Sequence, residues 1–180
     1  MGDVSLRYRI LDGLPAYGAP AEPFSASGHG MHREGFVVEF FDARGDRWTA
    51  NFQRGMTALD LVAESPTGTT FLVVAGGQGY VVAPNERRCL RTFGGQIEHA
   101  LLRPGHLVVS DGFYVEATDG EHLLWRTRRV SWDGIVGLRI EGERALGEAY
   151  DPMTDEWIPF SVDLANREVE GGSYPAELAE

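Results

Sequence analysis

The chain has 180 residues, of which 43% are hydrophobic and 24% are charged, with one cysteine and a formal net charge of −11. This hydrophobic fraction excludes a chain that is disordered throughout, and a single cysteine excludes a fold held by disulfide bonds. No stretch approaches the ~18 consecutive apolar residues of a membrane-spanning helix. Length and composition therefore predict one domain with a hydrophobic core of its own.

Residues 1–35 carry turn-forming residues every few positions, as in Asp12-Gly13-Leu14-Pro15. We interpret them as an irregular N-terminal arm packed on a sheet, and as a flexible tail if its apolar residues do not anchor it. Residues 1–10 lack the apolar segment of a signal peptide, so we expect none. The remaining residues, 36–180, are expected to form one all-β domain.

From residue 36 onward, short runs of β-branched and aromatic residues alternate with glycine turns, which is typical of successive antiparallel hairpins. The expected strands are 36–41, 48–52, 71–75, 80–83, 107–109, 113–117, 135–140, 145–150, 157–162 and 168–172. Only residues 57–63 and 96–102 have compositions that fit two helical turns each. We therefore expect an all-β, antiparallel sandwich or flattened barrel, or alternatively a small propeller-like arrangement.

A weak internal repeat accompanies these hairpins. Residues 72–92 align without gaps on residues 107–127, at an offset of 35, with seven identities in twenty-one positions. Stacked or radial β-units have spacings of this size. The alternative is that any two hairpins with glycine turns align equally well. Within the repeat, Gly76-Gly77-Gln78-Gly79 precedes a strand and not a helix, so it predicts a hairpin turn and not a phosphate-binding loop.

The single cysteine, Cys89, lies in the sequence Arg88-Cys89-Leu90-Arg91. Arginines that approach a thiol lower its pKa and make it a nucleophile. The neighbouring Leu90 and Phe93 indicate instead a small apolar residue on a strand, which is the interpretation we favour. One cysteine and no signal peptide are typical of a reducing compartment, so we expect a cytoplasmic protein.

The negative charge is concentrated toward the C-terminus. Residues 141–180 hold eleven acidic residues and two arginines, whereas residues 1–140 hold sixteen acidic and fourteen basic residues. Such a surface repels nucleic acid and anionic membranes, so we expect neither as a partner, and it attracts a basic protein. The alternative is that the acidic residues act only in solubility.

One basic run has tryptophans beside it: Arg128 and Arg129 precede Trp132 and Asp133, and Trp125 lies just before them. Arginine and tryptophan carry much of the binding energy at protein interfaces and stack on one another. The alternative is a structural role, in which these arginines pair with the acidic C-terminal strands.

The densest group of carboxylates is Asp151, Asp155 and Glu156, followed by Trp157. Oxygen ligands at this spacing suit Ca²⁺, with Asp163 as a fourth ligand, but an Asp-Pro turn exposed to solvent is the interpretation we favour. A general acid–base pair is a further alternative. Pro159 in the following strand indicates a sheet edge or a bulge.

Together these observations predict a non-enzymatic, cytoplasmic interaction module that binds a basic protein. One form of it is an acidic inhibitor or immunity-type protein that masks a nucleic-acid-cleaving partner. The alternatives are a hydrolase that uses the carboxylates near residues 151–156, and a small-ligand or carbohydrate binder that uses Trp125, Trp132 and Trp157. We expect no cofactor and no metal, and the pattern leaves the oligomeric state open. The candidate binding residues are Arg128, Arg129, Trp132, Asp133, Asp151, Asp155, Glu156 and Trp157.

Overall fold

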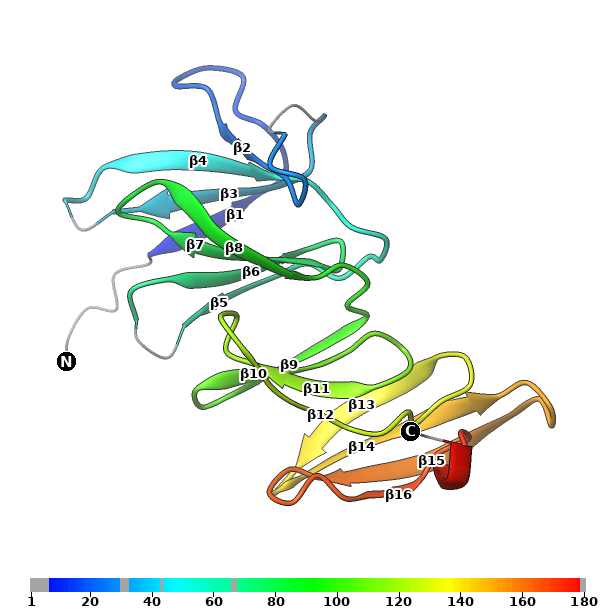
Figure 1. Cartoon of the computed structure of the whole chain (residues 1–180). Helices are drawn as coiled ribbons and strands as arrows, with labels where there is room; N and C mark the ends of the chain where they lie inside the picture. The colour runs from blue at the N-terminus through cyan, green and yellow to red at the C-terminus, as the bar shows by residue number, and fades with distance from the viewer. Residues whose placement is uncertain (1–6, 30–32, 43, 66–67, 179–180) are drawn as a thin grey trace. The chain divides into compact units, whose positions relative to one another are not determined.

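The structure is a computed structural model that describes residues 7–29, 33–42, 44–65 and 68–178. Sixteen strands and one short 3₁₀ helix, Ala176–Leu178, make up the regular structure of these residues, so the predicted all-β fold of successive hairpins is confirmed (Figure 1). The strands form four open sheets of four strands each. The chain divides into two compact units, Met1–Gln96 and Ile97–Glu180. The proposed boundary between an arm and a domain at residue 35 stays a prediction.

The first sheet of the first unit is built around a predicted hairpin. Strands β3 (Phe36–Phe41) and β4 (Arg47–Phe52) pair antiparallel. Two strands from the expected irregular arm extend this sheet: β1 (Tyr8–Leu11) pairs antiparallel with β3, and β2 (Glu22–Phe24) pairs parallel with β4. Pro23 is compatible with β2 because that strand is at the sheet edge, where no ladder hydrogen bond is needed on its outer side.

The second sheet is a meander of β5 (Leu61–Glu64), β6 (Phe71–Ala75), β7 (Gln78–Ala83) and β8 (Arg88–Gly94). The expectation of a helix over residues 57–63 is wrong. Strand β5 instead pairs with β6 over its whole length and buries Val62 in the core, and this pairing outweighs the weak helical tendency of a short segment.

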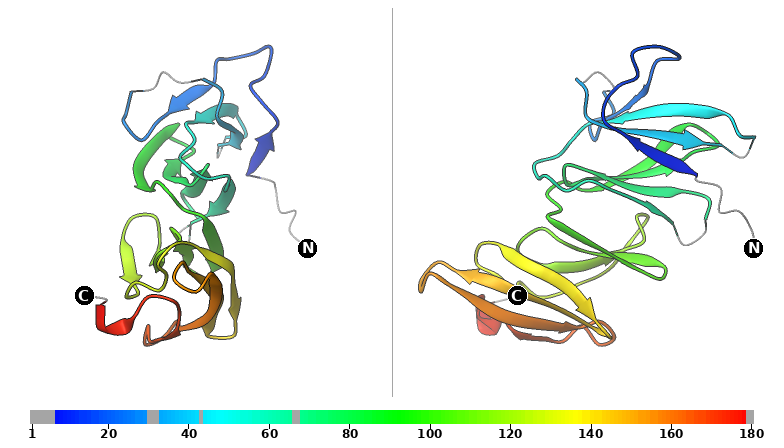
Figure 2. Two further views of the ribbon diagram at one scale, coloured as in Figure 1. Left: turned by 90° about the vertical axis from the view of Figure 1, so that its right-hand side faces the viewer. Right: turned by 180° about the vertical axis from the view of Figure 1, so that it is seen from behind.

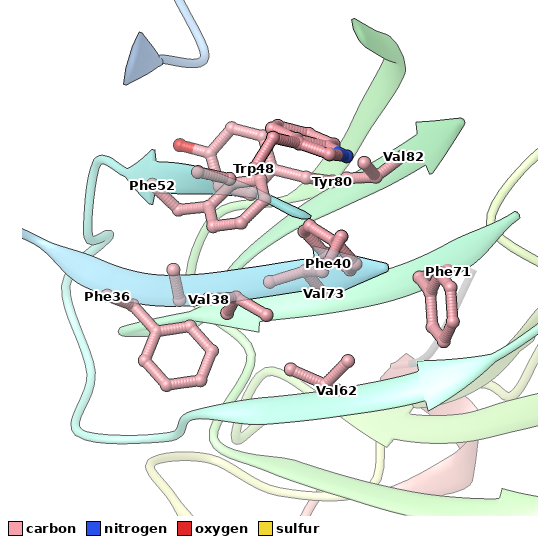
Figure 3. Packing of buried hydrophobic residues seen from close by; sticks show 12 residues of the cluster. Phe36, Val38, Phe40, Trp48, Phe52, Val62, Phe71, Val73, Tyr80 and Val82 are labelled. Atoms are coloured by element: carbon pink, nitrogen blue, oxygen red, sulfur yellow. The ribbon is translucent and has the colours of Figure 1, made fainter. Parts of the chain in front are cut away.

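Side chains from both sheets of the first unit form one core that is rich in aromatic residues (Figure 3). The ring of Phe40 is fully buried and its centroid lies 5.1 Å from that of Trp48 and 5.3 Å from that of Phe71. Further ring contacts join Phe52 to Tyr80 and Tyr8 to Phe71. The facing sheets of this unit thus form a two-layer arrangement of the predicted sandwich type.

The second unit begins with another meander, β9 (His99–Arg103), β10 (His106–Ser110), β11 (Val115–Thr118) and β12 (Leu123–Arg126). The expectation of a helix over residues 96–102 is also wrong, because this segment pairs as a strand. Every residue of β9 has a partner in β10, which the short helical pattern did not anticipate.

The last sheet contains the acidic end of the chain, in the order β13 (Ile135–Glu141), β14 (Arg144–Asp151), β15 (Glu156–Asp163) and β16 (Val169–Gly171). Its strands, yellow to orange-red, lie side by side in the views of Figures 1 and 2. Pro159 does not mark an edge strand, because β15 pairs with both β14 and β16. It lies one residue beyond the three-residue ladder with β16, and its carbonyl accepts a hydrogen bond from the N–H of Gly172 at 3.1 Å.

The core of the second unit consists of small aliphatic side chains contributed by both sheets. Phe160 is the only buried aromatic residue in the described part of this unit. The other buried members of the cluster are Val108, Val115, Val130, Ile135, Leu138, Ala145, Ala149 and Val162.

The sequence repeat corresponds to equivalent strands. Residues 72–92 span strands two to four of the β5–β8 meander, and residues 107–127 span strands two to four of the β9–β12 meander. The aligned turn glycines Gly77 and Gly112 have similar left-handed φ angles of 84° and 88°. Gly76-Gly77 is the turn between β6 and β7, so the predicted hairpin turn is confirmed. In the described residues no helix has the length and apolar character needed to cross a membrane.

Candidate functional site

The negative charge divides unevenly between the two units. Residues 97–180 contain seventeen acidic residues and seven arginines, a net charge of −10. Residues 1–96 contain ten acidic residues and nine arginines, a net charge of −1. All eight candidate binding residues lie in the second unit, which therefore carries both most of the negative charge and the candidate site.

Arg128 connects the segment after β12 to the C-terminal segment through backbone oxygens. Its Nη1 donates to the carbonyl of Tyr174 at 3.2 Å, and its Nη2 donates to the carbonyl of Gly171 at 3.1 Å. No described carboxylate is within ion-pair distance of this guanidinium. The alternative in which this arginine pairs with the acidic C-terminal strands is thus not found for Arg128, whose acceptors are carbonyl oxygens and not carboxylates.

Arg129 fixes the same segment by donating to carbonyls and by stacking. Its Nε donates to Ser131 O and its Nη2 to Trp132 O, both at 2.9 Å. The guanidinium carbon lies 4.9 Å from the ring centroid of Phe113 and 4.7 Å from that of Tyr174. These contacts engage the guanidinium groups, so both Arg128 and Arg129 have structural roles.

The loop that carries Asp133 is tied to the end of β14. The hydroxyl of Ser173 accepts from the backbone N–H of Trp132 at 3.1 Å and donates to the carbonyl of Tyr150 at 2.7 Å. The N–H of Tyr150 donates to the carbonyl of Gly134 at 3.0 Å. Asp133, which is distant in sequence from the β14–β15 turn, is therefore held beside that hairpin.

At that end of the hairpin, Tyr150 and Trp157 are cross-strand partners with ring centroids 5.1 Å apart. The Tyr150 hydroxyl donates to Asp155 Oδ1 at 2.6 Å. This hydrogen bond raises the pKa of Tyr150, and the nearby negative charges of Asp133 and Asp151 raise it further. Trp157 is 43% exposed, so an apolar ring faces solvent among carboxylates.

Asp151 and Glu156 close the hairpin as its last register pair. Asp151 Oδ1 accepts from the backbone N–H of Met153 at 2.9 Å, and Asp155 has a left-handed φ of 58°. These features belong to a tight turn that displays its carboxylates, in agreement with the turn interpretation.

The calcium interpretation of these residues has no support in the described part of the chain, where no three acidic, histidine or cysteine side chains are grouped as metal ligands. Asp163, the expected fourth ligand, is at the opposite end of β15 from Asp155. Its Oδ1 accepts from the backbone N–H groups of Ala165 and Asn166, which lowers the pKa of Asp163. The two carboxylates therefore serve separate turns.

The structure thus separates the eight predicted residues into two groups. Arg128, Arg129 and Trp132 hold the C-terminal segment, with the Trp132 ring 4.4 Å from that of Tyr174. The others surround one exposed hairpin end. We call this second group, together with Tyr150, the acidic–aromatic patch, and it comprises Asp133, Tyr150, Asp151, Asp155, Glu156 and Trp157.

Sequence reasoning missed Tyr150, the residue at the centre of this patch. A signal for it was present in the sequence. If Asp151 and Glu156 flank a four-residue loop, antiparallel register places Tyr150 opposite Trp157. It also missed Ser173 and Tyr174, because their contacts with Trp132 join positions about forty residues apart.

Cys89 is not an activated nucleophile. Burial raises the pKa of its thiol, and its Sγ donates to the carbonyl of Arg91 at 3.1 Å. Arg88 pairs with Glu86. Cys89 packs against the core of the first unit, as the strand interpretation predicted.

No protein-family model matches this chain, and no curated protein sequence is significantly similar to it. We therefore infer a function from the geometry and charge of the acidic–aromatic patch.

Proposed function

We propose that this protein is a non-enzymatic interaction module whose acidic–aromatic patch binds a basic protein. The observation that carries the proposal is the exposed Trp157 ring, which is set against Tyr150 with the Asp155 carboxylate beside them. A guanidinium or ammonium group stacks on such rings while a neighbouring carboxylate neutralises its charge. This combination suits an arginine or lysine side chain of a partner.

The charge of the whole second unit supports the same partner class. A net charge of −10 on residues 97–180 attracts a basic surface over distances of about one Debye length and accelerates encounter with it. We therefore expect an association rate that falls steeply with ionic strength.

Basic proteins that cleave nucleic acid form one specific class of such partners. An acidic surface that covers their phosphate-binding residues would inhibit them, so the protein would act as an inhibitor or immunity-type protein. A cytoplasmic location belongs to this proposal and was inferred from the single cysteine.

Two features favour this function over the alternatives. In a hydrolase, Asp151 and Asp155 would need to be available, whereas both accept local hydrogen bonds from the turn and from Tyr150. In a carbohydrate binder, several tryptophans would form a platform, whereas Trp125 packs against the core and Trp132 packs against Tyr174. Trp157 remains as a single exposed ring, which suits one cationic side chain.

The test uses two synthetic peptides, five repeats of Arg-Ser and five repeats of Glu-Ser, in calorimetric titrations with the full chain at low and at physiological salt. We expect the arginine peptide to bind, with an affinity that falls as salt rises, and the glutamate peptide not to bind. The variant D133N/D155N/E156Q should weaken binding by about tenfold or more.

The matched control removes three other carboxylates of the same unit, with the variant E121Q/E168Q/E177Q. It should change the affinity by less than about twofold, because these residues lie outside the patch. Equal weakening by both triple variants would show a diffuse charge effect and would overturn the proposed site.

A further inference from the structure

The outer face of the β13–β16 sheet continues from the acidic–aromatic patch. Alternation along β14 and β15 places Ala145, Ala149 and Phe160 in the core of the second unit. The residues between them face the other side, and register pairs Leu146 with Ser161, Glu148 with Pro159 and Tyr150 with Trp157. Consecutive pairs on this face are about 6.7 Å apart, so the Leu146 pair lies about 13 Å from the aromatic pair.

A shallow groove of about 660 Å³, open to solvent, lies on this face beside the patch. Leu146 and Pro159 provide apolar surface in it, and Ser161 is the only small hydroxyl residue among its lining side chains. The groove begins one register pair from Trp157. Its complete lining is Arg139, Leu146, Gly147, Glu148, Pro159, Phe160, Ser161, Glu170 and Gly171.

The charges around the groove are not equivalent. Arg139 Nε is bound by Glu141 at 2.8 Å, and Glu170 is bound by Arg144 at 3.0 Å. Glu148 is exposed and forms no ion pair with any residue that the structure describes. The groove therefore offers apolar surface together with one unneutralised carboxylate on the side nearer the patch.

We propose that this groove binds an apolar side chain of an extended basic segment whose arginine stacks on Trp157. The inference rests on the proposed function and specifies its partner: a peptide segment in which arginine and a leucine-like residue alternate on one face. In an extended chain, residues i, i+2 and i+4 lie on one face at the spacing of the three register pairs. The arginine lies on the aromatic pair, and the apolar residue two positions away lies over the Glu148–Pro159 pair, where Pro159 and its diagonal neighbour Leu146 provide apolar surface.

Charge complementarity selects this occupant. The unit carries a net charge of −10, Glu148 lines the groove at its end nearer the patch, and cationic side chains on both sides of the apolar residue would reach Glu148 and Asp155. A neutral apolar peptide would leave these carboxylates without partners, and an acidic one would be repelled.

The test compares two nine-residue peptides of equal charge, Arg-Ser-Leu-Ser-Arg-Ser-Leu-Ser-Arg and the same sequence with asparagine in place of leucine. Leucine and asparagine have similar shapes, so the pair isolates the apolar contact. The full chain should bind the leucine peptide about tenfold more tightly, measured by calorimetry at physiological salt. The variant Ser161→Tyr, which fills the groove, should abolish this preference and keep the affinity for the asparagine peptide.

The variant Leu146→Asn leaves the groove open but polar, and should reduce the preference if Ser161→Tyr does not fold. Equal affinity of the wild-type chain for the two peptides would overturn the groove assignment while leaving the proposed function intact. A preference for leucine that survives both variants would also overturn it. If neither peptide binds, the proposed function itself fails.

Discussion

The two units of this protein are built from the same parts but place their aromatic residues differently. Each unit contains two four-stranded sheets whose facing side chains form one core. In the first unit six aromatic side chains are buried, namely Phe36, Phe40, Trp48, Phe52, Phe71 and Tyr80. Among the residues of the second unit that the structure describes, Phe160 is the only buried aromatic residue, and the other aromatic side chains are half-buried or exposed.

Charge follows the same division, with −1 on residues 1–96 and −10 on residues 97–180. Buried rings stabilise a fold, whereas exposed rings surrounded by charge are typical of binding surfaces. We infer that the aromatic residues of the first unit serve stability and those of the acidic–aromatic patch serve recognition.

The largest expected difference concerns two single substitutions. Phe40→Ala removes a fully buried ring and should lower the free energy of unfolding by about 3–5 kcal/mol. Trp157→Ala should lower it by less than about 1 kcal/mol while abolishing binding of the arginine peptide. Urea denaturation followed by circular dichroism measures the free energy of unfolding of both variants. Hydrogen exchange in β3 assigns the loss of stability in Phe40→Ala to the first unit. Equal destabilisation by the two variants would contradict the comparison.

The second prediction concerns the attachment of the C-terminal segment. Arg128→Ala removes the donor to the half-buried carbonyl of Tyr174 and the exposed carbonyl of Gly171, and should cost about 0.5–1.5 kcal/mol. We expect faster hydrogen exchange at the N–H of Tyr174, which donates to Val130 O at 3.1 Å. Arg128→Lys should restore only part of the protection, since an ammonium lacks the planar fork that reaches both carbonyls. Unchanged exchange in Arg128→Ala would show that Trp132 and Tyr174 hold the segment without the arginine.

The third prediction compares two tyrosines, one in each unit. Burial raises the pKa of Tyr80 to about 12, whereas the hydrogen bond to Asp155 is the main cause of the raised pKa of Tyr150. When the pKa of a tyrosine is higher in the folded chain than in the unfolded chain, the protonated phenol favours the folded state. This contribution is complete at pH values below the unfolded-state pKa, which is near 10. For Tyr80 this stabilisation is lost as pH rises from about 10 to about 12.

Asp155→Asn should therefore lower the pKa of Tyr150 toward its ordinary value and leave that of Tyr80 unchanged. Tyrosinate absorbance in the ultraviolet is followed as pH rises, in the parent chain and in the variants Tyr80→Phe and Tyr150→Phe. The difference between parent and variant gives the pKa of each tyrosine. A fall in the pKa of both tyrosines would argue against separate causes in the two units.

The smallest expected effect distinguishes two similar surface ion pairs. Arg88 pairs with Glu86 at 2.6 Å in the first unit, and Arg139 pairs with Glu141 at 2.8 Å in the second. Both arginines are about equally exposed. Arg139→Gln should cost up to about 0.5 kcal/mol at low salt because the surrounding unit is strongly negative, and Arg88→Gln should cost less. High salt should remove the difference, which thermal denaturation at two ionic strengths would test.

Much of the fold could be predicted from the sequence because strong local signals mark its hairpins. The runs at residues 36–41 and 71–75 combine β-branched and aromatic residues with nearby glycine turns, and both form strands. Strands β5 and β9 were expected as helix, since short segments of mixed composition take their structure from the neighbours with which they pair. Strands β1 and β2 were missed because they are short and join the sheet across long loops.

The site was predictable only in part. Asp155 and Trp157 were identified from local density of charge and aromatic character, and they do lie together with Tyr150. The roles of Arg128 and Arg129 could not be read from sequence, because their acceptors are backbone carbonyls whose position depends on how the C-terminal segment folds back.

The four tryptophans allow one direct test of the central claim, that the second unit recognises a basic partner through the acidic–aromatic patch. The indole N–H resonances, assigned with Trp→Phe variants, are followed by nuclear magnetic resonance as the Arg-Ser peptide is added. We predict that the Trp157 signal shifts, while that of Trp48, whose buried indole donates to Pro84 O at 3.0 Å, does not move. A saturating titration that leaves Trp157 unchanged would contradict the account, as would one that moves Trp48 instead.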